Sequence, residues 1–223
     1  MTNPFQEGRL ILVNKPLDWT SADVVKKIRN RVHAKVGHAG TLDPLATGLL
    51  ILCTGKFTKK ISEYMSQEKE YTGTFTLGAT TPSFDLETLP ENLKDFSQIR
   101  AEDLEKICLR FTGEIMQVPP IYSAIKKDGK RSYELARQGK AVVLNERKVT
   151  IRVFEMHFHN PPLVSFRVVC STGTYIRSLA NDVGEALGCG AYLSSLCRTR
   201  IGNYRLEDAI DPEAPEIKTK TDN

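Results

Sequence analysis

The stretch GHAGTLDPLATGLL, residues 37–50, places one carboxylate, Asp43, between a run of small residues and an apolar segment. Asp before Pro is common turn chemistry, because the residue before a proline avoids the helical region and an Asp side chain can bond its own backbone. On this stretch alone, a structural turn is therefore the favoured interpretation. Residues 48–55, GLLILCTG, form a continuous apolar run bounded by glycines, which predicts a buried strand after the turn.

Periodic patterns on either side of this loop predict a mixture of helices and strands. Residues 9–16 predict a short buried strand, and residues 21–32 predict a helix with its Val and Ile side chains on one face. In KEYTGTFTLG, residues 69–78, alternation puts Tyr71 on the inward side of a strand. Because no regular strand–helix–strand repeat occurs, we predict one α+β unit built on a largely antiparallel sheet.

Two further segments differ in character from the predicted sheet. Residues 119–140 combine an Asp-Gly turn, dense basic residues and two tyrosines, which is typical of a surface excursion that grips something anionic. Beyond Ile210 the sequence offers little to bury, so residues 211–223 are predicted to be a polar, disordered tail. We therefore expect one domain over residues 1–210, with the excursion as part of it.

Composition and charge restrict the class of protein. The 223 residues are 40% hydrophobic and 26% charged, as in an ordinary globular protein, and no apolar run is long enough to span a membrane. The N-terminus lacks a basic-then-apolar signal pattern, so we expect a cytoplasmic protein. The net charge is +4, and clusters of Lys and Arg suit a polyanion such as nucleic acid. A solvated basic surface explains the same clusters equally well.

The common cofactor and hydrolase patterns are missing from the sequence. No glycine-rich nucleotide loop occurs, and the five cysteines never stand as a metal-binding or disulfide framework. His157 and His159 share one face of a predicted strand, but no further ligands stand nearby, so exposed histidines are favoured over a metal site. Glycoside or phosphoester hydrolysis needs a second acid or a metal, and Asp85 is the only nearby candidate.

Asp43, Tyr71 and Arg177 remain as residues that could carry chemistry together. If the fold brings them together, Arg177 would keep Asp43 ionised and oriented, and Tyr71 could stack on a planar ring. One paired carboxylate in an apolar-walled site suits nucleophilic or proton-abstracting work without a cofactor. Sequence spacing leaves open whether the three residues meet.

Several ordered motifs resemble the TruB family of tRNA pseudouridine 55 synthases. The resemblance runs from about residue 10 to residue 209 and is carried first by GHAGTLDPLATGLL. Further matches are NKPLDWTS (14–21), KEYTGTFTLG (69–78), PPIYSAIKKDGKRSYELARQG (119–139) and GTYIRSLANDVGEALGCGAYLSSLCRTRIG (173–202). The resemblance implies a pseudouridine-synthase-like catalytic domain, with a mostly antiparallel mixed central sheet flanked by helices and loops.

The resemblance also implies roles for individual residues. Asp43 matches the family's catalytic aspartate, Tyr71 the tyrosine that stacks on the target base, and Arg177 the arginine paired with the aspartate. Other positions match residues that shape the substrate site: the apolar wall Leu196, His38 where the uridine leaves the RNA stack, and Asp85 near the arginine. Four positions match residues that contact the T-arm RNA: Lys59, Arg137, Tyr175 and Arg198.

The implied reaction turns U55 in the T loop of tRNA into pseudouridine after the base leaves the stack. It needs no cofactor or metal, and we expect a monomer that requires no protein partner and no membrane. Whether Asp43 attacks C1′, attacks C6 or takes a ribose proton stays open, as does a base role for Tyr71 beside stacking. An alternative is a module that binds or folds tRNA, with the chemistry secondary.

Many bacterial members of the family carry a further C-terminal RNA-binding domain, and the polar residues 211–223 do not resemble one. We therefore expect that domain to be absent, and tRNA binding to be weaker or more sensitive to salt.

Overall fold

The computed structural model describes residues 3–122, 126–127, 130–131 and 144–220. The chain divides into two compact units, of which the first contains residues 1–72 and 195–223 and the second contains residues 73–194. The strands β4 (Lys69–Leu77) and β10 (Ala191–Ile201) have residues in both units. Each unit is described by itself below.

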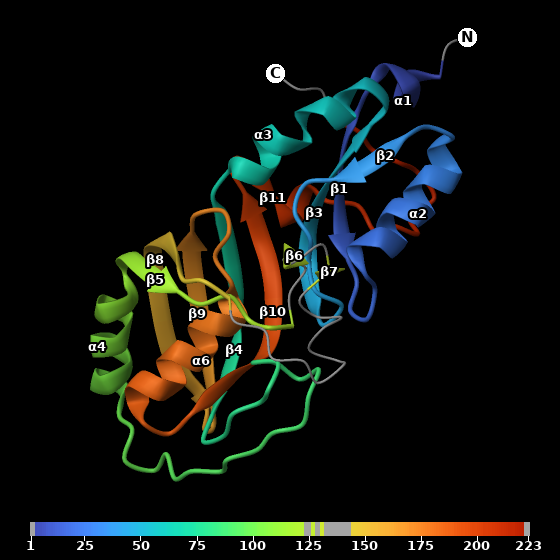
Figure 1. Ribbon diagram of the computed structural model, residues 1–223. Coiled ribbons are helices and arrows are strands. Elements are labelled where there is room, and N and C mark those ends of the chain that lie inside the picture. Colours follow the sequence, from blue (N-terminus) through green and yellow to red (C-terminus); the bar gives the residue numbers. More distant parts are fainter. Residues whose placement is uncertain (1–2, 123–125, 128–129, 132–143, 221–223) are drawn as a thin grey trace. The chain divides into compact units, whose positions relative to one another are not determined.

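The first unit is built from helices and strands that come from both terminal parts of the chain (Figure 1). Besides parts of β4 and β10, its elements are α1 (Pro4–Glu7), β1 (Leu10–Lys15), α2 (Ser21–Val32), β2 (Val36–His38), β3 (Ala46–Thr54), η1 (Gly55–Lys60), α3 (Ile61–Ser66), β11 (Tyr204–Arg205) and η2 (Leu206–Asp208). Its strand order is β1-β3-β10-β4, with β2 on β3 and β11 on β10. The strands β3 and β10 are parallel, whereas β1 and β2 pair with β3 in antiparallel fashion.

The core of the first unit lies on both sides of β1 and β3, because their side chains alternate between two apolar clusters. The predicted helix of residues 21–32 is confirmed as α2, which begins at a capping box formed by Thr20 and Asp23. Its buried Val24, Ile28 and Val32 cover one side of the two strands. The other side packs against α3 and the end of β10. The predicted strands of residues 9–16 and 48–55 are confirmed as β1 and β3.

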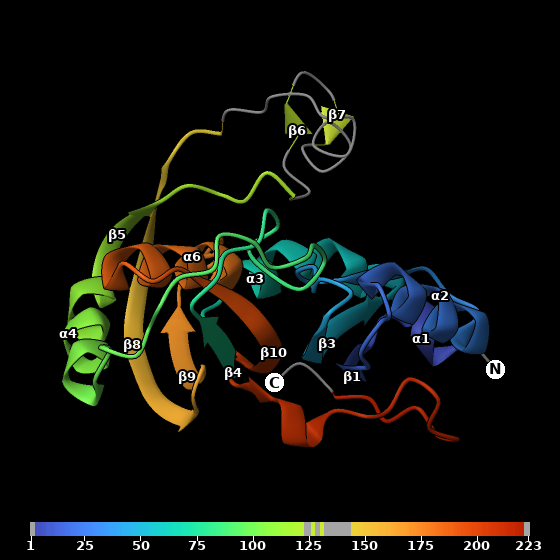
Figure 2. The same ribbon diagram turned by 90° about the horizontal axis from the view of Figure 1, so that it is seen from below.

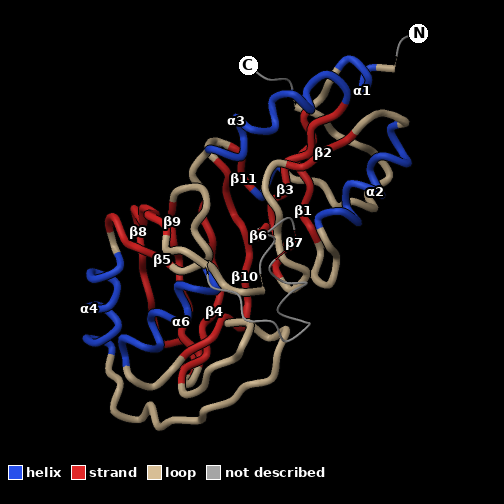
Figure 3. Tube along the Cα trace, viewed as in Figure 1, coloured by secondary structure: helices blue, strands red, loops and turns tan. Residues whose placement is uncertain are grey.

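The second unit contains the remaining helices and strands. These are α4 (Ala101–Phe111), β5 (Gly113–Gln117), β6 (Lys126–Lys127), β7 (Lys130–Arg131), β8 (Arg147–Asn160), β9 (Leu163–Cys170) and α6 (Ile176–Leu187). Its main strand order is β10-β4-β9-β8-β5, and the pairs β8–β9 and β5–β8 are antiparallel. The helix α4 contacts β8 and α6 (Figure 2). A long irregular segment, residues 78–100, joins β4 to α4 (Figure 3).

The architecture confirms the prediction of an α+β fold on a mostly antiparallel mixed sheet. Alternation in β4 is also confirmed, since Tyr71, Phe75 and Leu77 are buried. In the second unit the Phe75 ring stacks on Phe166, with ring centroids 4.2 Å apart. Of the basic excursion at residues 119–140, much lies outside the described residues, so its role stays a prediction.

The described part of the C-terminal tail, residues 211–220, contacts the first unit, while its predicted disorder stays a prediction. Ile217 lies against the apolar cluster that α2 covers. Arg31 donates to two backbone carbonyls of the tail at 3.1 and 3.0 Å, and Lys27 forms a 2.6 Å ion pair with a tail glutamate. A few apolar side chains and a basic helix face therefore provide contacts for a segment of polar composition.

Candidate active site

The Asp43 loop joins β2 to β3 and is held by backbone hydrogen bonds. The Ala46 amide donates to the Asp43 carbonyl at 3.0 Å, which closes a turn with Pro44 at its second position. The buried Ser21 hydroxyl accepts from the Leu42 amide at 2.9 Å, directly before the acid. The Asp43 side chain itself is partly exposed. The turn and the catalytic interpretations are therefore compatible, because a well-held turn presents the carboxylate.

Two fully buried cations lie under this loop. The Lys15 ammonium donates to the carbonyls of Pro16, Trp19 and Pro44. Burial lowers the pKa of Lys15 to about 8, and the nearby Asp43 carboxylate opposes this shift. The Arg198 guanidinium donates to the carbonyls of Leu49 and Gly40. The positive charges of Lys15 and Arg198 thus compensate the negative charge of the Asp43 carboxylate.

The parallel pairing of β3 with β10 places Leu196 beside the end of the loop. In the register, Leu196 lies opposite Ala46, and Arg198 lies opposite Gly48. Leu196 is partly buried, and its role as an apolar wall of the site stays a prediction. Gly48 has φ +104°, and a Cβ at this position would lie 2.4 Å from the Arg198 carbonyl oxygen. Only glycine lets the two strands approach this closely.

Replacing Gly48 by Ala is therefore expected to destabilise the fold by about 4 kcal/mol or more, since backbone strain and overpacking add. Gly113→Ala is the matched control, because Gly113 has φ +103° but open space where a Cβ would point. That variant should lose only about 1–3 kcal/mol from strain. Urea denaturation of both variants measures the difference. Equal losses would show that the approach of β10 to β3 relaxes without cost.

His38 lies at the end of β2, just before the loop. Burial is the largest factor that lowers the pKa of its imidazole, and the Arg198 charge lowers it further. Within the described part of the chain, its buried Nδ1 has no hydrogen-bond partner. The neutral imidazole is thus favoured at neutral pH.

The His38 imidazole is expected to titrate below its ordinary pKa of 6.5 in an NMR pH titration. Because the unfolded chain then binds the proton more readily, this histidine contributes stability above pH 6.5 that is lost as pH falls through its folded-state pKa. Denaturation of wild type and His38→Asn at pH 7.5 and pH 5 measures the effect. An equal loss of stability in both proteins on acidification would contradict it.

Arg177 and Asp85 form a buried ion pair in the second unit. Arg177 Nε lies 3.6 Å from an Asp85 carboxylate oxygen, and both side chains are less than a tenth exposed. The guanidinium also donates to the Ser83 and Tyr122 carbonyls at 3.3 and 2.9 Å. Asp85 accepts from the Ser83 hydroxyl at 2.6 Å. The expectation that Asp85 lies near the arginine is confirmed, whereas the pairing of Arg177 with Asp43, which belongs to the other unit, stays a prediction.

The remaining predicted RNA contacts differ in exposure. Lys59 is exposed on η1, and Tyr175 is partly exposed where α6 begins, with the Arg147 guanidinium 4.5 Å from its ring centroid. Arg137 lies outside the described residues. The Arg198 side chain is 1% exposed and bonded to backbone carbonyls, so its predicted contact with RNA stays a prediction.

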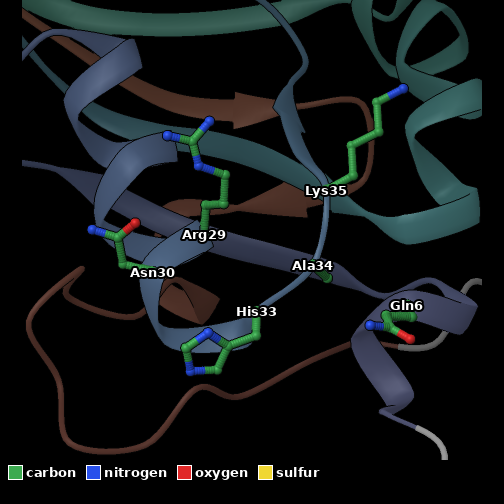
Figure 4. A pocket seen from close by; sticks show the side chains of 6 residues that line it. All are labelled: Gln6, Arg29, Asn30, His33, Ala34 and Lys35. Carbon is green, nitrogen blue, oxygen red and sulfur yellow. The ribbon is translucent and has the colours of Figure 1, made fainter.

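The basic surface of the first unit is smaller than the sequence clusters indicate. Arg200 lies 2.9 Å from a Glu68 carboxylate oxygen, and Lys27 and Arg31 bind the tail. An open hollow of about 590 Å³ at the end of α2 keeps a basic character, and no acidic side chain is among those lining it (Figure 4). Its lining residues are Gln6, Arg29, Asn30, His33, Ala34 and Lys35.

The described residues contain no group of three or more His, Cys, Asp or Glu placed to hold a metal ion. His157 and His159 are both exposed on β8, as the sequence favours. Among the helices that the structure describes, none has the length and apolar character needed to cross a membrane.

Lys15 and Ser21, whose side chains form hydrogen bonds with the backbone of the Asp43 loop, were not predicted from the sequence. The signal for Lys15 was a single charged residue at the end of an apolar strand, directly before a proline. A lysine that ends a core strand must find carbonyl partners, since its charge is costly to bury alone. Ser21 offered no such signal, because it also fits the start of α2.

Comparison with known proteins places the chain in a family. A model of the TruB family pseudouridylate synthase N-terminal domain matches residues 26–176, and a model of the tRNA pseudouridylate synthase B C-terminal domain matches residues 177–214. The chain therefore belongs to the TruB family of pseudouridylate synthases. The expected absence of a further RNA-binding domain stays a prediction.

Curated relatives and solved structures agree with this assignment. The chain is 53% identical to the tRNA pseudouridine synthase B of Flavobacterium johnsoniae. The alignment includes 93% of this chain and 94% of that protein. The corresponding protein of Phocaeicola vulgatus is 51% identical, with 94% of this chain and 92% of that protein aligned. A chain of a Cbf5–Nop10–Gar1 complex is 31% identical, with a TM-score of 0.70 over 90% of this chain. The protein covers 50% of that longer chain.

Proposed function

We propose that the protein converts U55 in the T loop of tRNA into pseudouridine, with Asp43 as the catalytic carboxylate. The observation that carries the proposal is the Asp43 loop, which backbone hydrogen bonds and two buried cations hold beside Leu196. Membership of the TruB family supplies the reaction class. The relatives named tRNA pseudouridine synthase B support tRNA as the substrate.

The reaction is an isomerisation and needs no external electrons. The N1–C1′ bond breaks, the uracil turns over, C5 bonds to C1′, and the hydrogen on C5 leaves as a proton while N1 gains one. Asp43 acts on the nucleotide by attack on C1′, by attack on C6 or by taking a ribose proton. A carboxylate can serve as nucleophile or base in each route without a cofactor.

Other residues of the proposed site handle the flipped base. Tyr71, 9% exposed on β4, offers an aromatic face for stacking, and a role in removing the C5 proton fits the same position. Leu196 supplies an apolar wall beside the loop. Arg177, which Asp85 holds by an ion pair, is included in the proposed site because it matches the family's active-site arginine. His38, with a lowered pKa, fills the gap that the uridine leaves in the stack.

RNA binding is proposed to rest on exposed basic and aromatic groups. Lys59 and Tyr175 contact the T arm, together with Arg137 of the basic excursion. Extracting a base from its stack costs a few kcal/mol, which phosphate contacts offset through counterion release. The basic hollow beside Arg29 and Lys35 adds positive charge in the first unit, and its lining includes no carboxylate that would repel phosphate.

Tritium release from a tRNA transcript made with [5-³H]uridine tests this function. The purified chain alone should release one equivalent per tRNA, without cofactor or protein partner. A transcript with cytidine in place of U55 is the matched control and should release none. Release from both transcripts would move the target to another uridine. Tight binding of tRNA without any release would favour the alternative, a module that binds or folds tRNA.

A further inference from the structure

We propose that Arg198 is a positioning residue that ties the two ends of the Asp43 loop together. This inference rests on the proposed function, because it assigns the residue that holds the catalytic carboxylate in place. Arg198 does not touch the reacting atoms and is not proposed as a catalytic residue. Its function is to set where Asp43 stands.

The hydrogen bonds of one guanidinium carry this inference. Its Nε donates to the Leu49 carbonyl at 2.8 Å, and one of its terminal nitrogens donates to the Gly40 carbonyl at 3.1 Å. Gly40 precedes Asp43 by three residues, and Leu49 follows it by six. A rigid, planar fork therefore links the chain before the acid to the chain after it, which a flexible ammonium reproduces poorly.

The backbone of Arg198, which carries this guanidinium, is itself fixed. The Arg198 backbone pairs with Gly48 in the parallel register of β10 and β3, at the point where only glycine allows the approach. The side chain is 1% exposed, so water does not compete for its donors. A buried cation with two fixed carbonyl partners has little freedom to move. The Asp43 loop is thereby connected to a core strand rather than to a surface group.

Contact with RNA is the competing role, and the two roles affect different steps. A phosphate contact contributes to binding, so its loss weakens affinity and lowers the salt dependence. A positioning contact contributes to the chemical step, because a carboxylate displaced by about 1 Å reacts on the order of 100-fold more slowly. Single-turnover rates at saturating tRNA separate the two.

The test compares Arg198→Met and Arg198→Lys with the control Arg205→Met, which removes an exposed arginine of β11. We expect Arg198→Met to lower the saturating single-turnover rate about 100-fold, with the tRNA Kd unchanged within twofold. Arg198→Lys keeps the charge but not the fork, so its rate should lie between those of Arg198→Met and wild type. Arg205→Met should keep the wild-type rate. A weaker Kd with an unchanged saturating rate would overturn the proposal, as would no change at all.

A second readout does not depend on activity. Amide hydrogen exchange of residues 40–48 should accelerate at least tenfold in Arg198→Met and stay unchanged in Arg205→Met, at a temperature where circular dichroism shows both variants folded. Unchanged exchange in Arg198→Met would overturn the proposal. If Arg198→Met does not fold, Arg198→Lys decides by the same two measurements. A wild-type protein that is inactive on tRNA would refute the proposed function, while exchange would still test the Arg198 tie.

Discussion

Replacing Asp43 by Asn is expected to abolish pseudouridine formation, with the rate falling about 10⁴-fold or more. The amide keeps the size of the side chain and its place in the turn, but it is neither a nucleophile nor a base. The loop itself should persist, because its hydrogen bonds run through backbone atoms, Ser21, Lys15 and Arg198. Affinity for tRNA should therefore stay within a few fold of wild type. Tritium release and filter binding measure the two quantities.

Asp18→Asn is the matched control for this variant. Asp18 has an exposed side chain, and its backbone amide donates to the Pro44 carbonyl at 3.0 Å. The residue therefore adjoins the same turn. Its φ is +62°, a conformation that asparagine tolerates well. This control should keep near wild-type activity. Activity in Asp43→Asn comparable to the control would remove Asp43 from the mechanism.

Replacing Arg177 by Met is expected to destabilise the protein by about 3–5 kcal/mol, because it leaves the Asp85 carboxylate buried without its cation. The carbonyls of Ser83 and Tyr122 lose donors as well. Denaturant unfolding measures the loss. Asp85→Asn combined with Arg177→Met should recover part of it, since the isolated charge is then gone.

Arg167→Met provides the exposed counterpart. Arg167 lies 3.3 Å from a Glu155 carboxylate oxygen, and both side chains are about half exposed. Its loss should change stability by less than about 1 kcal/mol. If the Arg177 variant proved as mild as this control, the buried pair would be incidental to the second unit. If the double variant were no better than Arg177→Met, the cost would come from the lost carbonyl contacts instead.

Local patterns predicted the elements near the site well. The α2 helix follows from its capping residues and the spacing of Val24, Ile28 and Val32, which need no partner to be recognised. Alternation in β4 likewise identified Tyr71 as inward. The Asp43 turn was predicted because glycines, a proline and one acid stand together before an apolar run, whereas the catalytic role of Asp43 was implied by the family resemblance. In each case the decisive interactions lie within a few residues of one another.

Long-range interactions set the limits of sequence reasoning. Arg198 stands in a basic cluster of the sequence, but its burial depends on β10 pairing with β3 about 150 residues earlier. The tail was predicted to be disordered from its polar composition, which gives no sign of its contacts with Arg31 and Lys27 on a distant helix. Charged residues are expected at the surface by default. A buried arginine that donates to backbone carbonyls is therefore mistaken for one that binds a ligand.

The division of the first unit into residues 1–72 and 195–223 has a consequence for synthesis on the ribosome. The second unit is continuous, so it can fold as soon as residues 73–194 have emerged. The Asp43 loop is translated early, yet its partners Leu196 and Arg198 arrive more than 150 residues later. A nascent chain therefore carries the acid long before it carries the support that orients it. Assembly of the Asp43 loop with its supporting strand is therefore postponed until β10 has been translated.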